Sequence, residues 1–598
     1  MTTAETAEVT AEADAPPVAA PEPPRRWSSR RLALAALALL SVQFAALSLH
    51  QAWNDALTVD EAPYMATGLA ILNDGETRLN NEAPFFPKAV NALPMRIAGV
   101  HIPLEGAWAQ ADTISGDNLY DFGPLAAEFI DHHTEYGNLQ QVVFVGRLMP
   151  VLEGLALVWV LYALGATLFS RGAGLLAAAA WSTTPLAIGF GHVNGLDLAF
   201  ALAVAAAALA LARHLRAPSW RTLAVLALAA GALQLVRHTG VLYVAVICVA
   251  LVVARWRDRA AAARDVAIVL VATWALVWVA ILVVAPTRTP VDHAAVERYL
   301  DPIRATEQGA VAGMMSDALG LVPWPAEYEV GFQVQLAISD GSSPGFLLGD
   351  AWQGARPAFW PLAMVVKLPV TVVALVLLAP LGWRTVGRER RRTAVLVAVL
   401  PTLAAFAFVL PYGRPIGLRY ALPGIVMLVV VASPLALALV RRRAGQVALG
   451  IGAVAQLAFL WSSVPHSLAW TAPPFRPAHR VVSESNLDWG QDGYRLAAWL
   501  EGRTAHVAYL GGADPVSDLP GHIPLLGTPP EEVTGWVAVS ATLLTTYARD
   551  ELAWLRAHCH VGTIGGSIVL FRFDVPPTAE PGPAAPAGRC RGPVSYRV

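Results

Sequence analysis

The segment Leu57-Thr58-Val59-Asp60-Glu61-Ala62-Pro63-Tyr64 places two adjacent carboxylates directly after a long apolar run. One interpretation is structural: Asp60 caps a helix, and Pro63 falls in the first turn, where its missing N–H costs nothing. The other is chemical, because a carboxylate at a membrane–water boundary can accept a proton from a hydroxyl group. The two are compatible only if one oxygen of Asp60 stays free, so both remain open on these residues alone.

Cationic side chains form a second set of candidates. Arg237, Arg414 and Arg419 lie in short turns between apolar runs, and a guanidinium group can bind two phosphate oxygens at once. Anchoring to lipid headgroups explains these arginines equally well at this stage. Lys88 and Lys367 are the only lysines among 42 basic residues, and Lys88 stands beside an apolar stretch, where a long side chain commonly reaches toward headgroups.

The turn Gly191-His192-Val193-Asn194-Gly195-Leu196-Asp197 contains a third set of candidates. An aspartate at the mouth of a membrane span is costly unless it is hydrated or paired, so Asp197 is a functional candidate. A single histidine in such a turn is more often a satisfied structural group. Because His192 and Asp197 lack a third convergent ligand, we predict no metal site.

A carboxylate and arginines on one side of a membrane suit the transfer of a sugar from a lipid phosphate. The phosphate is already a good leaving group, so no general acid is needed. The reaction needs a base for the attacking hydroxyl and cations for the departing phosphate. With base and leaving group on opposite faces of the sugar ring, the displacement would be inverting.

The composition indicates what holds these residues. Of 598 residues, 56% are hydrophobic and 14% are charged, against roughly 25% charged in an average soluble protein. The net charge of −2 gives no bulk attraction to nucleic acid, and three cysteines exclude a disulfide scaffold. We therefore predict a polytopic α-helical membrane protein with about eleven spans. The predicted spans are 32–53, 142–168, 172–190, 194–213, 220–236, 239–254, 266–285, 358–381, 394–411, 417–440 and 446–463.

The arginines predict the orientation of these spans. With the N-terminus in the cytoplasm, twenty arginines fall in cytoplasmic segments, whereas the short outer turns carry only Arg237, Arg414 and Arg419. The basic flank at 25–31 resembles a twin-arginine export signal, but no small-residue cleavage site follows it, which favours an uncleaved first span.

The chain divides into four predicted regions. A disordered cytoplasmic tail (1–31) precedes the membrane domain (32–463), whose large outer loops are 54–141 and 286–357. An extracytoplasmic α/β domain and a Pro/Ala-rich tail follow, at 464–575 and 576–598.

Shorter elements are predicted outside the membrane. Residues 87–100 are apolar but too short to span, so we expect an interfacial helix. Strands are expected at 506–510, 535–539 and 567–575, and a helix at 547–557. A disulfide between Cys559 and Cys590 would suit an oxidising compartment, but a loose tail is an equal alternative.

The candidate residues resemble those of the GT-C membrane glycosyltransferases, and more narrowly glycosyltransferase family 39, which includes protein O-mannosyltransferases and aminoarabinose transferases. Asp60-Glu61 with Tyr64 resembles the acidic signature of the first outer loop. Residues 80–88 are similar to an Asn-Pro-Glu-His-Pro-Pro-Leu-Ala-Lys stretch of bacterial members, with Ala83 and Phe85 replacing the His and the second Pro.

Three further blocks are similar to the family. Residues 328–369 resemble its Gly-containing loop and the Lys-Thr-Pro stretch that follows it. The most specific blocks are Ile416-Gly417-Leu418-Arg419-Tyr420-Ala421-Leu422-Pro423, similar to an Arg-Tyr-Leu-Pro motif, and Ser485-Asn486-Leu487-Asp488-Trp489-Gly490-Gln491-Asp492. The resemblance covers roughly 32–495, and residues 505–598 add nothing to it.

The resemblance implies a polyprenyl-phosphate sugar donor and a protein, lipid or glycan acceptor on the outer face of a bacterial cytoplasmic membrane. It implies Asp60 as the base with Glu61 in support, and Arg419 as the main phosphate contact, with Arg237, Lys88 and Lys367 as further candidates. No cofactor is expected, and metal dependence is left open. Candidate substrate-binding residues are Tyr64, Glu82, His192, Asp197 and Tyr420.

Two alternatives come from other functional classes. A transporter or lipid flippase commonly shows internal repeats and binding groups near the bilayer midplane. Here the ionisable residues cluster at the outer mouth, and no half of the sequence resembles the other. A receptor or assembly protein would leave the acidic pair and the outer arginines without a role.

Overall fold

The computed structural model describes residues 29–102, 123–284, 290–304, 320–337, 343–577 and 594–596. Most of the predicted N-terminal tail and most of the C-terminal tail lie outside these ranges. Residues 29–31, predicted as part of the disordered tail, belong to the first helix. Cys559 is disulfide-bonded, but its predicted partner Cys590 also lies outside the described residues, so that pairing stays a prediction.

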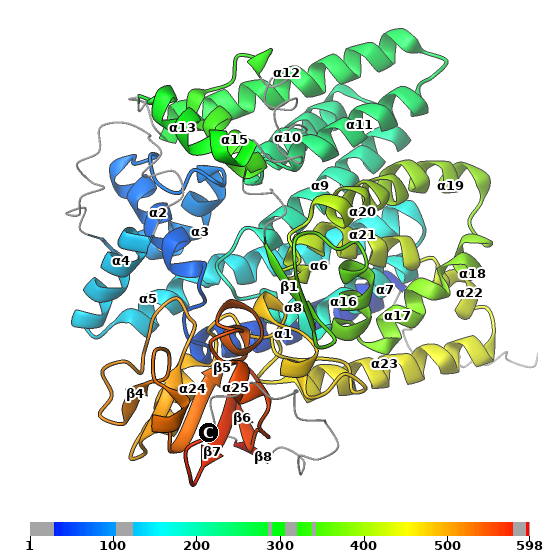
Figure 1. Cartoon of the computed structure of the whole chain (residues 1–598). Coiled ribbons are helices and arrows are strands. Elements are labelled where there is room, and N and C mark those ends of the chain that lie inside the picture. The colour runs from blue at the N-terminus through cyan, green and yellow to red at the C-terminus, as the bar shows by residue number, and fades with distance from the viewer. Residues whose placement is uncertain are drawn as a thin grey trace, which may run out of the picture.

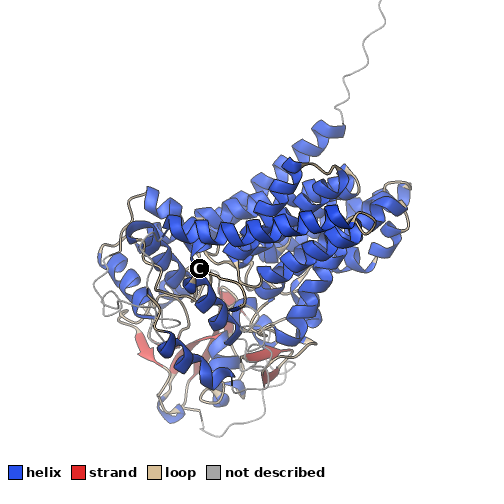
Figure 2. Cartoon of the chain, turned by 90° about the horizontal axis from the view of Figure 1, so that it is seen from above, coloured by secondary structure: helices blue, strands red, loops and turns tan. Residues whose placement is uncertain are grey.

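Long apolar helices form the body of the molecule and run together in Figure 2. In the described part of the chain, seven helical stretches are long and apolar enough to cross a membrane. They are α1 (Ser29–Asn54), α5 (Leu139–Gly146) with α6 (Leu148–Leu168), α9 (Asp197–Arg216), α12 (Arg259–Val284), α19 (Arg388–Ala394) with α20 (Leu400–Tyr412), α21 (Leu422–Ala432) with α22 (Leu435–Leu439), and α23 (Arg443–Ser463). The shorter apolar helices α10 (Trp220–Val236) and α11 (Gly240–Ala254) coincide with two further predicted spans.

The two remaining predicted spans are broken rather than continuous. Span 172–190 divides into α7 (Arg171–Ser182) and α8 (Pro185–Phe190), because Thr184 caps the second piece and Pro185 starts it. Span 358–381 divides into α16 (Phe359–Lys367), α17 (Val370–Leu377) and α18 (Ala379–Trp383). Pro369 forces Leu368 into an extended conformation, which ends α16.

The outer loops contain helices of their own. Helices α2 (Glu61–Asp74), α3 (Phe85–Ile97) and α4 (Gly123–Glu135) form a group beside the long helices in Figure 1. Helix α3 confirms the expected short helix, shifted slightly toward the N-terminus. A side chain at Gly68 of α2 would collide with the Lys88 carbonyl, so glycine permits the close crossing of α2 and α3. The second loop contributes α13 (His293–Arg304), α15 (Ala326–Ala337) and the hairpin β1 (Pro344–Leu347)–β2 (Asp350–Gln353).

The C-terminal region folds as an α/β domain, which lies beside α2–α5 in Figure 1. Its sheet has the strand order β4-β3-β5-β7-β6-β8, with β5 and β6 antiparallel to β7. The three predicted strands are confirmed. The predicted helix 547–557 shortens to α25, because Tyr547 ends a π-helical segment and turns occupy residues 548–552. The elements are α24 (Gly493–Leu500), β3 (Ala505–Ala508), β4 (His522–Pro524), β5 (Gly535–Ser540), α25 (Ala553–Arg556), β6 (Gly562–Ile564), β7 (Ile568–Phe573) and β8 (Val594–Tyr596).

Candidate active site

Asp60 precedes helix α2 but does not cap it. Its side chain accepts no hydrogen bond from the first turn, so the capping interpretation is wrong, although Pro63 does lie in that turn. One carboxylate oxygen forms an ion pair with Arg419 instead. No other side chain or N–H group in the described ranges donates to this carboxylate. Its second oxygen is therefore available to a substrate hydroxyl.

Arg419 reaches Asp60 from the 3₁₀ turn Leu418–Ala421. Its guanidinium group lies 4.3 Å from the ring centroid of Trp489 and 5.1 Å from that of Tyr420. The Nε–H of Arg419 is buried and meets no acceptor among the described residues. Because a buried donor without an acceptor is costly, an incoming anion would be stabilised here.

A second ion pair joins Arg237, which follows α10, to Asp197, the first residue of α9. The N-terminus of a helix favours a negative charge, so the carboxylate is well placed there. Arg237 also lies 5.2 Å from the ring centroid of Tyr420. The guanidinium groups of Arg237 and Arg419 thus both lie close to the ring of Tyr420.

Both ion pairs line one cavity of about 210 Å³. The start of α2, the loop before α3, the start of α9 and the residue after α10 contribute to it. Helix α15, the turn before α21 and the C-terminal region complete it. The lining residues are Val59, Asp60, Tyr64, Glu82, Ala83, Leu196, Asp197, Arg237, Gln335, Arg414, Ile416, Arg419, Tyr420, Glu484 and Tyr547.

Two carboxyl groups in this cavity each accept a hydrogen bond from a tyrosine. The Tyr64 hydroxyl donates to Glu82 Oε1 at 3.3 Å, and the Tyr547 hydroxyl donates to Glu484 Oε1 at 2.8 Å. Burial, together with the charge of Asp60, raises the pKa of Glu82. Burial also raises the pKa of Glu484, against the opposing charge of Arg419. Both groups therefore hold a proton more readily than an exposed glutamate does.

Glu61 does not line the cavity, so the structure does not bring it together with the side chain of Asp60. Its carboxylate accepts hydrogen bonds from Arg147 at 2.8 and 2.6 Å, and from the Asn194 and Thr58 N–H groups at 2.8 and 2.9 Å. Both members of the pair are completely buried. Arg147 also donates to three carbonyls at the end of α1, those of Ala52, Asp55 and Ala56. Glu61 therefore holds α1, α2 and α6 together.

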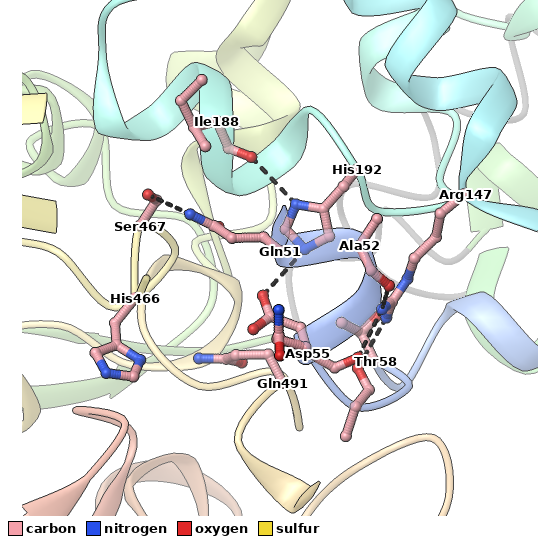
Figure 3. A network of polar contacts seen from close by, with 12 residues as sticks. Gln51, Ala52, Asp55, Thr58, Arg147, Ile188, His192, His466, Ser467 and Gln491 are labelled. Carbon is pink, nitrogen blue, oxygen red and sulfur yellow. Dashed lines mark hydrogen bonds and ion pairs between the residues drawn. The ribbon is translucent and has the colours of Figure 1, made fainter. Parts of the chain in front are cut away.

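His192 belongs to the neighbouring polar network of Figure 3 rather than to the cavity. One ring nitrogen lies 3.1 Å from Asp55, and the other lies 3.2 Å from the Ile188 carbonyl. Asp55 also binds Arg495 at 2.8 Å. Although burial opposes it, the charges of Arg495 and His192 lower the pKa of Asp55 to about 2. His192 is thus a satisfied structural group outside the cavity lining, and its substrate-binding role stays a prediction.

Lys88 is also absent from the cavity lining. Its ammonium group donates to the side chain of Asn80 at 2.6 Å and to the carbonyl of Ala83 at 3.0 Å. Burial lowers the pKa of Lys88 to about 7, against the opposing charge of Glu82. Lys88 therefore shapes the 80–83 loop that carries Glu82, and the structure places it away from a phosphate site in the cavity.

Lys367 lies at the end of α16 and is buried. Its ammonium group donates to the carbonyls of Leu468, Trp470 and Asn486, at 2.7, 2.6 and 2.6 Å. These three bonds use the donors of the ammonium group. Lys367 thus joins α16 to the segment after α23 and does not line the cavity, so its phosphate contact stays a prediction.

The Ser485–Asp492 block links the two sides of the site. The Val59 N–H donates to the Trp489 carbonyl at 3.1 Å, next to Asp60. The Leu418 N–H donates to Asn486 Oδ1 at 3.0 Å, next to Arg419. One short segment therefore positions both the carboxylate and the arginine.

Sequence reasoning missed several site residues. Arg147 supports the site from outside the cavity. It lies within a predicted span, where the energetic cost of a charged residue is a signal of a buried partner. Glu484 directly precedes the block that resembles the family, but Tyr547 and Gln335 carry no comparable signal. Arg414 was identified in its turn without being assigned to the site. Within the described ranges, no group of three or more His, Cys, Asp or Glu residues could hold a metal ion.

Part of the chain is similar to a known protein family, and the chain resembles solved structures at low identity. Residues 137–284 match the family described as dolichyl-phosphate-mannose-protein mannosyltransferase. No curated protein matches the chain. The archaeal oligosaccharyltransferase AglB from Archaeoglobus fulgidus, in complex with an inhibitory peptide and a dolichol-phosphate, is 11% identical, with a TM-score of 0.47 over 90% of this chain and 73% of that one. ArnT from Cupriavidus metallidurans in the apo state is 14% identical, with a TM-score of 0.32 over 90% of this chain and 98% of that one.

The family match extends from the start of α5 through α6, α9 and α10 to the end of α12. It therefore includes Arg147, Asp197 and Arg237, but neither Asp60 nor Arg419. The match agrees with the resemblance drawn from the sequence, because residues 137–284 are similar to the dolichyl-phosphate-mannose-protein mannosyltransferase family.

Proposed function

We propose that the chain is an inverting glycosyltransferase, which moves a sugar from a polyprenyl-phosphate donor to a hydroxyl acceptor on the outer face of the cytoplasmic membrane. The observation that carries this proposal is the Asp60–Arg419 ion pair in a polar cavity. Among the described residues, it joins a carboxylate that has one unused oxygen to a guanidinium group whose buried Nε–H has no acceptor.

The charges of the cavity favour an anionic donor. Three arginines face four carboxyl groups, Asp60, Glu82, Asp197 and Glu484. Burial raises the pKa of Glu82 and of Glu484, which weakens the negative charge that these two groups present to the arginines. A lipid phosphodiester would bring a further negative charge to the three cations.

The residues suggest a sequence of events. The donor phosphate binds Arg419 through its unused Nε–H and competes with Asp60 for the same guanidinium group. The oxygen of the acceptor hydroxyl then attacks the anomeric carbon, and Asp60 accepts the proton of that hydroxyl. The bond from that carbon to the phosphate breaks, and the phosphate keeps the electron pair. Arg419 and Arg237 neutralise the charge that develops on the departing group.

Cells with and without the gene provide the first test. Mass spectrometry of envelope glycans, glycolipids and glycoproteins should find a glycan that is lost on deletion and restored by the wild-type gene. Asp60→Asn should insert normally without restoring it. If the glycan pattern is unchanged while a polyprenyl phosphate accumulates on one membrane face, the chain is a flippase and the proposal is wrong.

A further inference from the structure

The two tyrosine–glutamate pairs come from different parts of the chain. Tyr64 and Glu82 belong to the first outer loop, which also supplies Asp60. Glu484 and Tyr547 belong to the C-terminal region and enter the same cavity from the other side. Tyr547 lies outside the part of the sequence that resembles the glycosyltransferases, so the resemblance assigns it no role.

The Glu484 side chain is held firmly in the cavity. Its backbone adopts a positive φ of 55°, which is uncommon for a residue with a side chain. Its N–H donates to Thr542 Oγ1 at 2.9 Å, and one carboxyl oxygen accepts the Ser485 N–H at 2.6 Å. Because the other oxygen accepts the Tyr547 hydroxyl, residues on both sides fix the direction of this carboxyl group.

The second pair opens to water. Half of the Tyr547 surface is exposed, although this residue also lines the cavity. In contrast, Glu82 accepts a hydrogen bond from Tyr64 and lies in the 80–83 loop, which Lys88 supports through Asn80. Tyr547 therefore offers a partly exposed side of the cavity to a molecule that arrives from the water.

We propose that Glu484 and Tyr547 form the acceptor-binding side of the cavity. A carboxyl oxygen of Glu484 hydrogen-bonds a hydroxyl group of the acceptor, and the exposed ring of Tyr547 covers the acceptor's apolar face. The attacking hydroxyl gives its proton to Asp60, so Glu484 orients the acceptor and takes no proton from it. This inference rests on the proposed glycosyl transfer and deepens it, because it gives the C-terminal domain a role in substrate selection.

The test uses the full chain in lipid nanodiscs with radiolabelled polyprenyl-phosphate mannose and the envelope fraction of a deletion strain. Three quantities are measured: label transferred to the envelope fraction, free mannose released to water, and binding of undecaprenyl phosphate. We expect Tyr547→Ala and Glu484→Ala to raise the half-saturating amount of envelope acceptor at least tenfold and to lower the ratio of transfer to release. The affinity for undecaprenyl phosphate should stay within twofold of wild type.

Matched variants separate this role from a structural one. Tyr547→Phe keeps the ring but loses the bond to Glu484, so it should raise half-saturation less than Tyr547→Ala does. Exposed Tyr136 and Glu501 lie outside the cavity lining, and Tyr136→Phe and Glu501→Gln should leave all three quantities unchanged. If Glu484→Ala unfolds, the variants Tyr547→Ala and Tyr547→Phe still provide the test, because position 547 is half-exposed and tolerates substitution better.

The inference and the proposed function fail in different ways. The acceptor role alone is contradicted if the two alanine variants lose undecaprenyl phosphate binding in step with transfer. It is also contradicted if both variants keep the half-saturating amount of acceptor of the wild type. Glycosyl transfer itself is contradicted if the wild-type protein neither transfers nor releases mannose from this donor, and does neither with any other polyprenyl-phosphate sugar. The inference then fails with it.

Discussion

Asp60 and Arg419 form an ion pair in the cavity although 359 positions separate them in the sequence. Trp489 connects them: its carbonyl accepts the Val59 N–H beside Asp60, and its ring lies 4.3 Å below the Arg419 guanidinium group. A cation over an aromatic face is stabilised by about 0.5–2 kcal/mol. The base and the cation of the proposed reaction are thus held by one residue.

Asp60→Asn should retain the fold and lose glycosyl transfer. Asparagine keeps the shape of aspartate but cannot take the proton of a hydroxyl, and loss of a general base lowers rates by about 10²–10⁴-fold. The assay is transfer from polyprenyl-phosphate mannose in nanodiscs, with exposed Asp74→Asn as the control. Near-wild-type transfer by Asp60→Asn would exclude Asp60 as the base.

Arg419→Ala should weaken donor binding. Hydrogen bonds to a charged group contribute about 1.5–3 kcal/mol, so the affinity for undecaprenyl phosphate should fall about 10- to 100-fold. Arg419→Lys should recover part of the affinity, because it restores the charge without the planar fork. Arg572, whose side chain is 57% exposed on β7, provides the control. Unchanged affinity in Arg419→Ala would move the phosphate site elsewhere.

Arg147→Met should destabilise the protein rather than alter its chemistry. Removing one partner of a buried ion pair costs about 3–5 kcal/mol, since the other charge stays buried. The unfolding temperature should fall for Arg147→Met and recover in part when Glu61→Gln is added, because the stranded charge is then removed. A variant Glu61→Gln that unfolds like wild type but transfers no sugar would restore a catalytic role for Glu61.

Lys367→Met should lower the unfolding temperature without changing donor affinity. The substitution leaves three buried carbonyls without their ammonium donor, and each unsatisfied group costs about 1–3 kcal/mol. Thermal unfolding and undecaprenyl phosphate binding are measured on the same preparation. Weaker binding at unchanged stability would reinstate Lys367 as a phosphate ligand.

Asp488 should make stability depend on pH. Burial raises the pKa of Asp488 from 3.8 to about 7, although the Thr542 N–H donates to its carboxylate at 3.0 Å. Between these values the folded protein holds more protons than the unfolded chain, so stability falls as the pH rises, by up to about 1.4 kcal/mol per pH unit. The advantage of Asp488→Asn over wild type should therefore grow from pH 5 to pH 8.

Unfolding at several pH values measures this difference. Exposed Asp518→Asn provides the control, and its stability should follow wild type at every pH. An advantage of Asp488→Asn that is constant between pH 5 and pH 8 would show that Asp488 is ionised in the folded protein throughout this range.

Neighbouring residues explain why the sequence predicted only part of the site. Asp60 and Glu61 are adjacent acids at the start of α2, but successive side chains on a helix point about 100° apart. Asp60 therefore faces the cavity while Glu61 faces Arg147. Residue type indicated that each carboxylate needed a partner, but it did not indicate which partner or on which side.

The same reasoning separates the cations. Arg237 and Arg419 break the positive-inside pattern, and both line the cavity as expected. Lys88 and Lys367 are equally unusual in the sequence, yet both are buried among backbone carbonyls. An isolated cation beside an apolar helix is compatible with a ligand site or with carbonyl partners, and only the positions of the carbonyls distinguish them.

The sequence by itself determined the class of the molecule, because hydrophobic runs, arginine placement and turn residues act locally along the chain. It predicted that seven residues (Asp60, Tyr64, Glu82, Asp197, Arg237, Arg419 and Tyr420) belong near one end of the membrane spans. Only the tertiary structure decided that these residues meet in one cavity, and that Glu484 and Tyr547 complete it. Such contacts join segments hundreds of residues apart, and they depend on side-chain direction and packing, which no local pattern encodes.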